Sequence, residues 1–205
     1  MLNPGFVTRK ALAAWQDIPT FLPQFQFHEQ HRTIVHTTRP DAILPLIAEF
    51  DVQQDTVIRW LMSLRQIPQK FLRHQHIQAT SNFGMHSFTL LKRSPSELCY
   101  GLRGQFWRAD FGLENVPDAD AFQAAVAPGS AKLLLRYRVT ELTPGKHELC
   151  TETFIYCPDR KTTLKMSAYW LAIRAGSGWI RKRTLEAVKS NIQDVKSDAE
   201  DKLTR

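Results

Sequence analysis

Hydrophobic and polar positions alternate in the middle of this chain and change to helical spacing in its last third. Within residues 132–142, Leu133, Leu135 and Tyr137 share one side of a predicted strand, while lysine and arginine occupy the other. From Leu164 onward, apolar or small residues recur at helical spacing, which predicts a long amphipathic helix. Strands followed by such a helix are typical of a curved sheet folded around that helix, often with an enclosed cavity.

Turn and capping residues divide the rest of the chain into shorter elements. Thr38 and Asp55 suit helix N-caps. Pro45 removes a backbone donor inside the helix that follows Thr38, so we expect a kink there. The expected order is a helix at 6–17, a strand at 26–37, helices at 38–50 and from Asp55, strands at 86–92 and 97–105, a short helix at 118–126, and strands at 132–142 and 147–157 before the long helix. This order predicts an α+β fold.

The long C-terminal helix is interrupted by the Gly-Ser-Gly sequence at residues 176–178. Glycine in a helix costs about 1 kcal/mol relative to alanine, and Ser177 can cap a new helical segment. We therefore predict two segments, 159–175 and 177–199. The first would close the cavity, and the second would grip the edge of the sheet and carry a basic face.

The length of 205 residues suits one domain with a single core. We expect residues 1–25 to form an N-terminal extension with a short helix, residues 26–200 to form the domain, and residues 201–205 to be a polar tail. The sequence contains no internal repeat and no low-complexity tract.

Apolar runs and cysteines predict a cytoplasmic protein. No run approaches the roughly 20 apolar residues that would span a bilayer, and the N-terminus lacks the apolar core of a signal peptide. The three cysteines, Cys99, Cys150 and Cys157, have no metal-ligand spacing. Cys150 and Cys157 point to opposite faces of one predicted strand and cannot pair, so reduced thiols are expected.

The formal net charge of +7 allows two interpretations. The basic residues gather mainly in the C-terminal helix, with a smaller set in the strand at 132–142. They indicate either peripheral contact with an anionic membrane or a solvated helix face. The acidic residues near the C-terminus favour the solvated face. No stacking aromatics interleave with these cations, so we expect no nucleic-acid partner. The oligomeric state is left open.

Histidines and known motifs predict neither a metal site nor a cofactor. His74, His76 and His86 are the nearest approach to a cluster, but no cysteine or aspartate lies near them to complete a ligand set. A polar connector explains them better. The sequence contains no nucleophile elbow, phosphate loop, dinucleotide fingerprint or paired-cysteine motif.

Glu152 is the first candidate for chemistry, and its role depends on strand register. A two-residue turn at Pro144-Gly145 would pair Glu152 with Tyr137 on the apolar inner face, where burial raises a carboxyl pKa and suits acid or base catalysis. An odd-numbered loop would instead turn Thr151 and Thr153 inward. Glu152 would then form a surface ion pair with Arg136 or Arg138, worth about 0 to 1 kcal/mol. The sequence leaves both registers open.

Aromatic residues from separate elements are the other candidates. They would line an apolar pocket or simply fill the core. A buried phenol needs a hydrogen-bond partner, so the tyrosines could also orient the polar end of a ligand. The predicted ligand-binding set is Trp60, Phe88, Tyr100, Trp107, Tyr137, Glu152, Tyr169 and Trp170.

Gly101 and Gly104 interrupt a predicted strand, where glycine usually weakens the sheet. They predict either a bulge or a close approach of another part of the chain.

Two segments resemble an uncharacterised bacterial branch of the START-like superfamily, which includes polyketide cyclases and is often labelled SRPBCC. Residues 98–107, Leu-Cys-Tyr-Gly-Leu-Arg-Gly-Gln-Phe-Trp, resemble its Gly-Leu-x-Gly-x-Phe-Trp segment. The second segment resembles its Thr-Glu-Thr strand and its Tyr-Trp-x-x-Ile…Ser-Gly-x-Ile-Arg helix, and comprises Thr151-Glu152-Thr153, Asp159, Tyr169-Trp170, Ile173, Ser177-Gly178, Ile180-Arg181 and Leu185. In element order, the resemblance covers roughly residues 28 to 190.

The resemblance implies a helix-grip fold, in which a seven-stranded antiparallel sheet wraps the C-terminal helix around an apolar cavity. Binding of a hydrophobic small molecule or lipid is then the leading hypothesis. The alternatives are a cyclase- or dehydratase-like enzyme using Glu152 or a cavity tyrosine as acid or base, and a non-catalytic interaction protein whose cavity is filled by its own side chains. The resemblance implies no catalytic residue.

Overall fold

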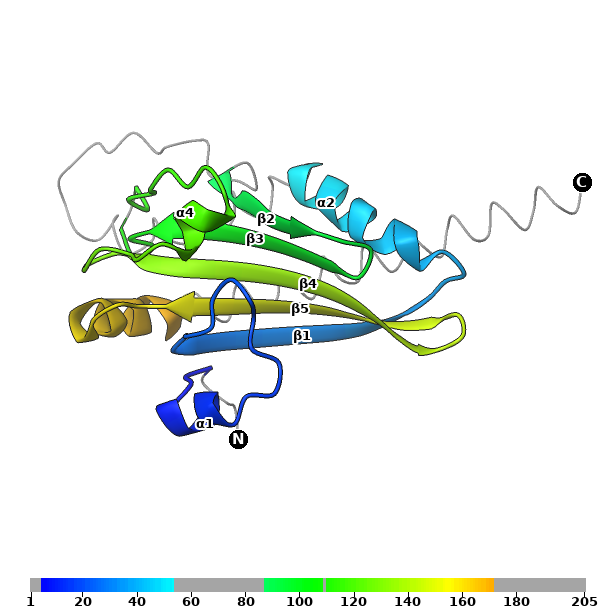
Figure 1. The fold of residues 1–205 in the computed structure, drawn as a ribbon, viewed down its shortest axis with the longest axis horizontal. Coiled ribbons are helices and arrows are strands. Elements are labelled where there is room, and N and C mark those ends of the chain that lie inside the picture. Colours follow the sequence, from blue (N-terminus) through cyan, green and yellow to red (C-terminus); the bar gives the residue numbers. More distant parts are fainter. Residues whose placement is uncertain (1–4, 54–86, 109, 172–205) are drawn as a thin grey trace, which may run out of the picture.

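A computed structural model describes residues 5–53, 87–108 and 110–171. Five antiparallel strands form one sheet in these residues, in the order β1-β5-β4-β3-β2 (Figure 1). The strands are β1 (Phe27–His36), β2 (Thr89–Arg93), β3 (Glu97–Gly104), β4 (Ala131–Thr143) and β5 (Lys146–Tyr156). The helices are α1 (Arg9–Ala13), the 3-10 turn η1 (Pro40–Ala42), α2 (Ile43–Gln53), α4 (Ala119–Gln123) and a helix at 160–171. The fold is α+β.

The long hairpin of β4 and β5 forms the centre of the sheet. Gly145 occupies its turn with φ of 76°, a backbone conformation that glycine adopts without a steric penalty. The pairing shifts by one residue between Glu141 and Thr143, so a bulge precedes the turn. From His147 onward, every residue of β5 is therefore paired one position away from where a plain two-residue turn would place it.

One face of the sheet, here called the inner face, is covered by α2 and by the helix at 160–171. The side chains of Leu135, Tyr137 and Leu149 point to this face and pack with α2. They belong to the Leu149 cluster, which comprises Val35, Ile43, Leu44, Ile47, Leu98, Leu135, Tyr137, Val139 and Leu149. Toward the other end of the strands lies the Trp170 cluster, which comprises Phe27, Leu102, Phe106, Ala131, Ile155, Cys157, Met166 and Trp170.

The opposite face, here called the outer face, is covered by α4 and by the N-terminal segment that precedes β1 (Figure 1). Leu22 and Phe25 from that segment and Phe122 from α4 pack against Phe154 of β5. The full Phe154 cluster comprises Leu22, Phe25, Cys99, Val116, Phe122, Leu134 and Phe154. Different segments of the chain thus pack on the two faces, and these segments determine which partners the polar residues of the sheet contact.

Gly101 and Gly104 lie in a regular stretch of β3 that pairs continuously with β4. A Cβ atom on Gly101 would lie 2.6 Å from the Phe122 ring, and one on Gly104 would lie 2.8 Å from the carbonyl oxygen of Phe111. Close approach, rather than a bulge, therefore explains both glycines. The bulge in this part of the sheet lies in β2, between Leu90 and Lys92.

The helix after β1 differs from its prediction at its start. Arg39 occupies the N-cap of η1 without a side-chain hydrogen bond, and the hydroxyl of Thr37 accepts a hydrogen bond from the backbone N–H of Arg39. The predicted Thr38 cap is therefore wrong. Pro45 lies in the first turn of α2, where backbone donors have no intrahelical acceptor, so the physical reason for the predicted kink is absent.

Asp159 begins the last helix as predicted. Its carboxylate accepts hydrogen bonds from the backbone N–H of Thr162 at 2.8 Å and from the backbone N–H of Gly129 at 3.2 Å. The predicted helix from Asp55, the three histidines at 74, 76 and 86, and the predicted segment at 177–199 lie outside the described residues. None of the described helices is long and apolar enough to cross a membrane.

Candidate functional site

The register of β4 and β5 decides between the two predicted orientations of Glu152. Arg136 pairs with Glu152, and Tyr137 pairs with Thr151. The bulge before the turn adds one residue to β4, so the loop behaves as an odd-numbered one. Glu152 consequently lies on the outer face, while Thr151 and Thr153 lie on the inner face with Tyr137.

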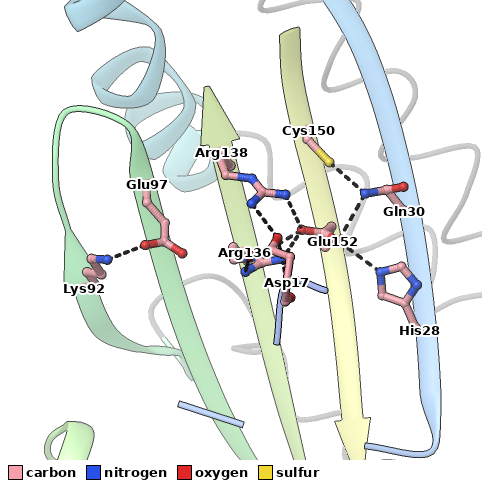
Figure 2. A network of polar contacts seen from close by, with 9 residues as sticks. All are labelled: Asp17, His28, Gln30, Lys92, Glu97, Arg136, Arg138, Cys150 and Glu152. Carbon is pink, nitrogen blue, oxygen red and sulfur yellow. Dashed lines mark hydrogen bonds and ion pairs between the residues drawn. The ribbon is translucent and has the colours of Figure 1, made fainter. Parts of the chain in front are cut away.

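Glu152 is nevertheless not part of a surface ion pair, because only 3% of its area is exposed. Arg136 donates to its Oε2 from Nη2 at 2.6 Å and from Nε at 2.9 Å. The guanidinium of Arg136 also donates to Asp17 Oδ2 at 2.7 Å, and Arg138 contacts both Asp17 and Glu152 (Figure 2). The expectation of an exposed pair is wrong since the N-terminal segment, which brings Asp17, covers this part of the sheet.

The other oxygen of Glu152 is held from β1. Gln30 donates to Oε1 at 3.1 Å, and His28 Nε2 lies 3.1 Å from the same oxygen (Figure 2). The imidazole of His28 is itself packed between aromatic rings, with ring centroids 4.7 Å from Trp15 and 4.8 Å from Phe154. Asp17, His28, Gln30, Arg136, Arg138 and Glu152 are called the Glu152 network below.

Burial alone would raise the pKa of Glu152, but the hydrogen bond from His28 and the positive charge of Arg136 outweigh it and lower the pKa below its usual value. For Asp17, likewise, the charges of Arg136 and Arg138 outweigh the effect of burial and lower the pKa. Glu152 is therefore ionised and accepts hydrogen bonds from the cation of Arg136. It lacks the raised pKa that the acid-base hypothesis required.

A second polar group crosses the inner face between the two apolar clusters. Glu29 pairs with Thr153, and His31 pairs with Thr151. The imidazole Nε2 of His31 lies 3.3 Å from Glu29 Oε1. Thr151 and Thr153 are each only 1% exposed, and within the described part of the chain neither hydroxyl has a hydrogen-bond partner. These four residues are called the inner polar row.

The residues predicted to bind a ligand divide between the faces. Tyr137 lies in the Leu149 cluster, with Tyr100 packed against it. Trp170 lies in the Trp170 cluster, and three more predicted residues pack against that cluster: Phe88, Trp107 and Tyr169. These six residues accompany the inner polar row. Glu152 lies on the opposite face, and Trp60 lies outside the described residues.

The sequence placed Thr151 and Thr153 on the inner face in only one of the two possible registers of β5, and it assigned them no role. Glu29 and His31 were detectable in the sequence, because they share one side of β1 with the apolar residues Phe27 and Val35. A charged and a titratable residue on the apolar side of a strand indicate a polar group within a core. The sequence could not show that they lie beside Thr151 and Thr153, because this depends on the pairing of β1 with β5.

The cysteines contribute no reactive group to either face. All three are free and buried. Burial raises the pKa of Cys99 and Cys157 to about 12 and that of Cys150 to about 11, so the thiols are protonated near neutral pH. Among the described residues, no group of three or more histidine, cysteine, aspartate or glutamate side chains is placed to hold a metal ion.

No family model matches the chain, and comparisons with curated proteins and with solved structures found no significant match. The geometry of the two faces is therefore the basis for any functional conclusion.

Proposed function

We propose that this protein binds a largely apolar small molecule that carries a hydrogen-bonding group, on the inner face of the sheet between α2 and the helix at 160–171. The observation that carries the proposal is the pair of buried hydroxyls of Thr151 and Thr153, which have no hydrogen-bond partner among the described residues. A buried polar group without a partner costs about 1 to 3 kcal/mol. A ligand hydroxyl, carbonyl or amine placed against these threonines would supply the missing hydrogen bonds.

The surroundings of the inner polar row suit the remainder of such a ligand. Along β5, Leu149 of one apolar cluster precedes the two threonines and Ile155 of the other follows them. Apolar ligand surface lying against either cluster is stabilised by about 25 cal/mol for each Å² removed from water. The predicted aromatic residues on this face would contribute apolar lining, and the polar row would determine the orientation.

The enzymatic alternative is less well supported than binding. Of its two acid-base candidates, a cavity tyrosine and Glu152, the latter lies on the outer face and is ionised through its contacts with Arg136 and His28. The interaction-protein alternative differs from our proposal in one measurable respect, because it requires no ligand. We also infer a cytoplasmic location, since all three thiols are free and a reducing compartment keeps thiols so.

The test is native mass spectrometry of the purified chain, followed by solvent extraction and identification of any co-purifying molecule. We expect an adduct in the wild type that is lost or much reduced in the double variant Thr151→Val and Thr153→Val. Thr140→Val is the matched control, because Thr140 is exposed on the opposite face of β4 and should keep the adduct.

Loss of the adduct in the Thr140 variant as well would show that the threonines of the inner face have no special role. If the wild type carries no adduct, and no member of a panel of apolar alcohols, ketones and amines raises its melting temperature, then the binding proposal is wrong and the interaction-protein alternative is favoured.

A further inference from the structure

The helix at 160–171 presents leucine side chains to solvent on the side that faces away from the sheet. Met166 and Trp170 bury the other side of the helix against the Trp170 cluster. By contrast, Leu164 is 74% exposed and Leu171 is 56% exposed. Ala168, which is also exposed, lies between them. The spacing of four and three residues aligns these side chains in one stripe along the helix.

Cations flank this stripe. Arg160, Lys161 and Lys165 are all exposed, and residues 160–171 contain no aspartate or glutamate. Asp159, immediately before the helix, is engaged with Thr162 in the N-cap. The exposed side of the helix therefore combines two leucines with positive charge, on a chain whose net charge is +7.

We propose that this side of the helix, here called the Leu164 face, docks on an anionic lipid membrane. Leucine side chains would enter the boundary between headgroups and acyl chains, and the three cations would contact anionic headgroups. This is the arrangement by which amphipathic helices lie in a membrane interface. Basic residues close to an anionic leaflet each strengthen such binding, and the attraction is screened by salt.

Charge and size favour a membrane over a protein partner. A second copy docked through the same face would bring Lys161 and Lys165 of both chains together without a compensating carboxylate on residues 160–171. A stable protein interface also needs about 800 Å² from each partner, which two leucines and an alanine do not provide. A lipid surface needs no matching shape and supplies the opposite charge.

The experiment is co-sedimentation of the full chain with vesicles of phosphatidylcholine alone and of phosphatidylcholine mixed with phosphatidylserine. We expect binding to the mixed vesicles only, and weakening as salt is raised. Lys161→Gln should reduce partitioning about fivefold, since one basic residue near an anionic surface contributes about that factor. Leu164→Ser should reduce it further, and both variants should melt at the wild-type temperature because these side chains are exposed.

The matched control is Leu142→Ser with Lys146→Gln, at the turn of the β4–β5 hairpin, which lies at the opposite end of the sheet from the helix (Figure 1). Both residues are exposed, so the control removes one exposed leucine and one exposed cation elsewhere, and it should bind like the wild type. Equal loss in the control, or equal binding to both kinds of vesicle, would overturn the proposal. So would a self-association that Leu164→Ser abolishes in a chain that does not bind vesicles.

A phospholipid is itself a largely apolar molecule with hydrogen-bonding groups, so the double variant Thr151→Val and Thr153→Val separates the two proposals: it should lose the adduct and still bind vesicles like the wild type. A chain that fails to bind vesicles but carries an adduct would refute only the membrane inference. A chain that binds vesicles but carries no adduct, and whose melting temperature no member of the small-molecule panel raises, would refute only the proposed function.

Discussion

Neighbouring polar residues of β5 differ in their hydrogen-bond partners according to the face of the sheet on which they lie. Glu152 on the outer face has partners for both carboxylate oxygens, drawn from β1 and β4. Thr151 and Thr153, its immediate neighbours on the inner face, are as deeply buried but have no partner for their hydroxyls among the described residues. Complete pairing indicates a structural role, whereas the two hydroxyls without partners are the observation on which the proposed ligand site rests.

The structural role of the Glu152 network is to attach the N-terminal segment. Asp17 reaches Arg136 and Arg138 across a sequence separation of about 120 residues, and Trp15 lies against His28. The segment thereby removes Arg136 and Glu152 from water. A buried ion pair does not necessarily stabilise a fold more than apolar residues would, but removing one partner leaves an uncompensated charge.

Removing the cation of the network should produce the largest effect. Arg136→Met leaves Glu152 buried without the cation that donates two hydrogen bonds to its Oε2, and we expect the free energy of unfolding to fall by about 3 to 5 kcal/mol. The measurement is urea denaturation at neutral pH. Arg32→Met is the control, since Arg32 is exposed and forms only a 3.4 Å pair with Glu148, worth about 0 to 1 kcal/mol. Similar losses in the two variants would contradict the structural role of the network.

Filling the close approach beneath α4 should have the next largest effect. A methyl group at Gly101 would overlap the Phe122 ring and the Leu91 side chain, so Gly101→Ala should lower the free energy of unfolding by about 1 to 3 kcal/mol. Phe122→Leu in the same chain should recover part of this loss by vacating the space. A double variant no more stable than the sum of the two single changes would show that the contact is not responsible.

Acid should weaken the outer face specifically. The pKa of Glu152 is lower in the folded chain than its usual 4.5, so the unfolded chain binds the proton more readily. The stabilising contribution is present above about pH 4.5 and is lost as the pH falls through the lower folded-state pKa. Asp17 changes in the same direction, although its partial exposure weakens its contribution.

In the wild type, the melting temperature should fall as the pH is lowered below about 4.5. In Glu152→Gln, it should fall less steeply over the same range. Glu148→Gln, which alters a more exposed carboxylate on the same face of β5, is the control and should keep the wild-type slope. If Glu152→Gln also retains that slope, another carboxylate governs acid unfolding.

The smallest effect on stability is expected on the inner face. Thr151→Val with Thr153→Val removes hydroxyls that have no partner among the described residues, so the ligand-free chain should be no less stable than the wild type. Urea denaturation after solvent extraction of any co-purifying molecule measures this difference. A loss above about 1 kcal/mol would mean that the hydroxyls already contribute to the fold, and the contrast between the faces would disappear.

Local structure could be predicted wherever the pattern of hydrophobic and polar residues lies within a single strand or helix. The alternation in β4 correctly indicated which residues share a face, and the helical spacing correctly placed a helix after Asp159. Gly101 and Gly104 indicated close approach as one of two options. Steric and hydrophobic preferences of this kind act between neighbours in the chain, so a single segment carries the whole signal.

Only the tertiary structure determined the environment of Glu152 and of the two threonines. One extra residue in a bulge near Leu142 sets the register of β5, and a shift of one residue exchanges the faces of every side chain. The burial of Glu152 depends in addition on Asp17 and the segment around it, which are distant in the sequence and come together with β4 and β5 only in the folded chain. The sequence by itself determined the strands and their two faces, whereas chain packing decided that Glu152 is fully paired and that its neighbours Thr151 and Thr153 have hydroxyls without a partner among the described residues.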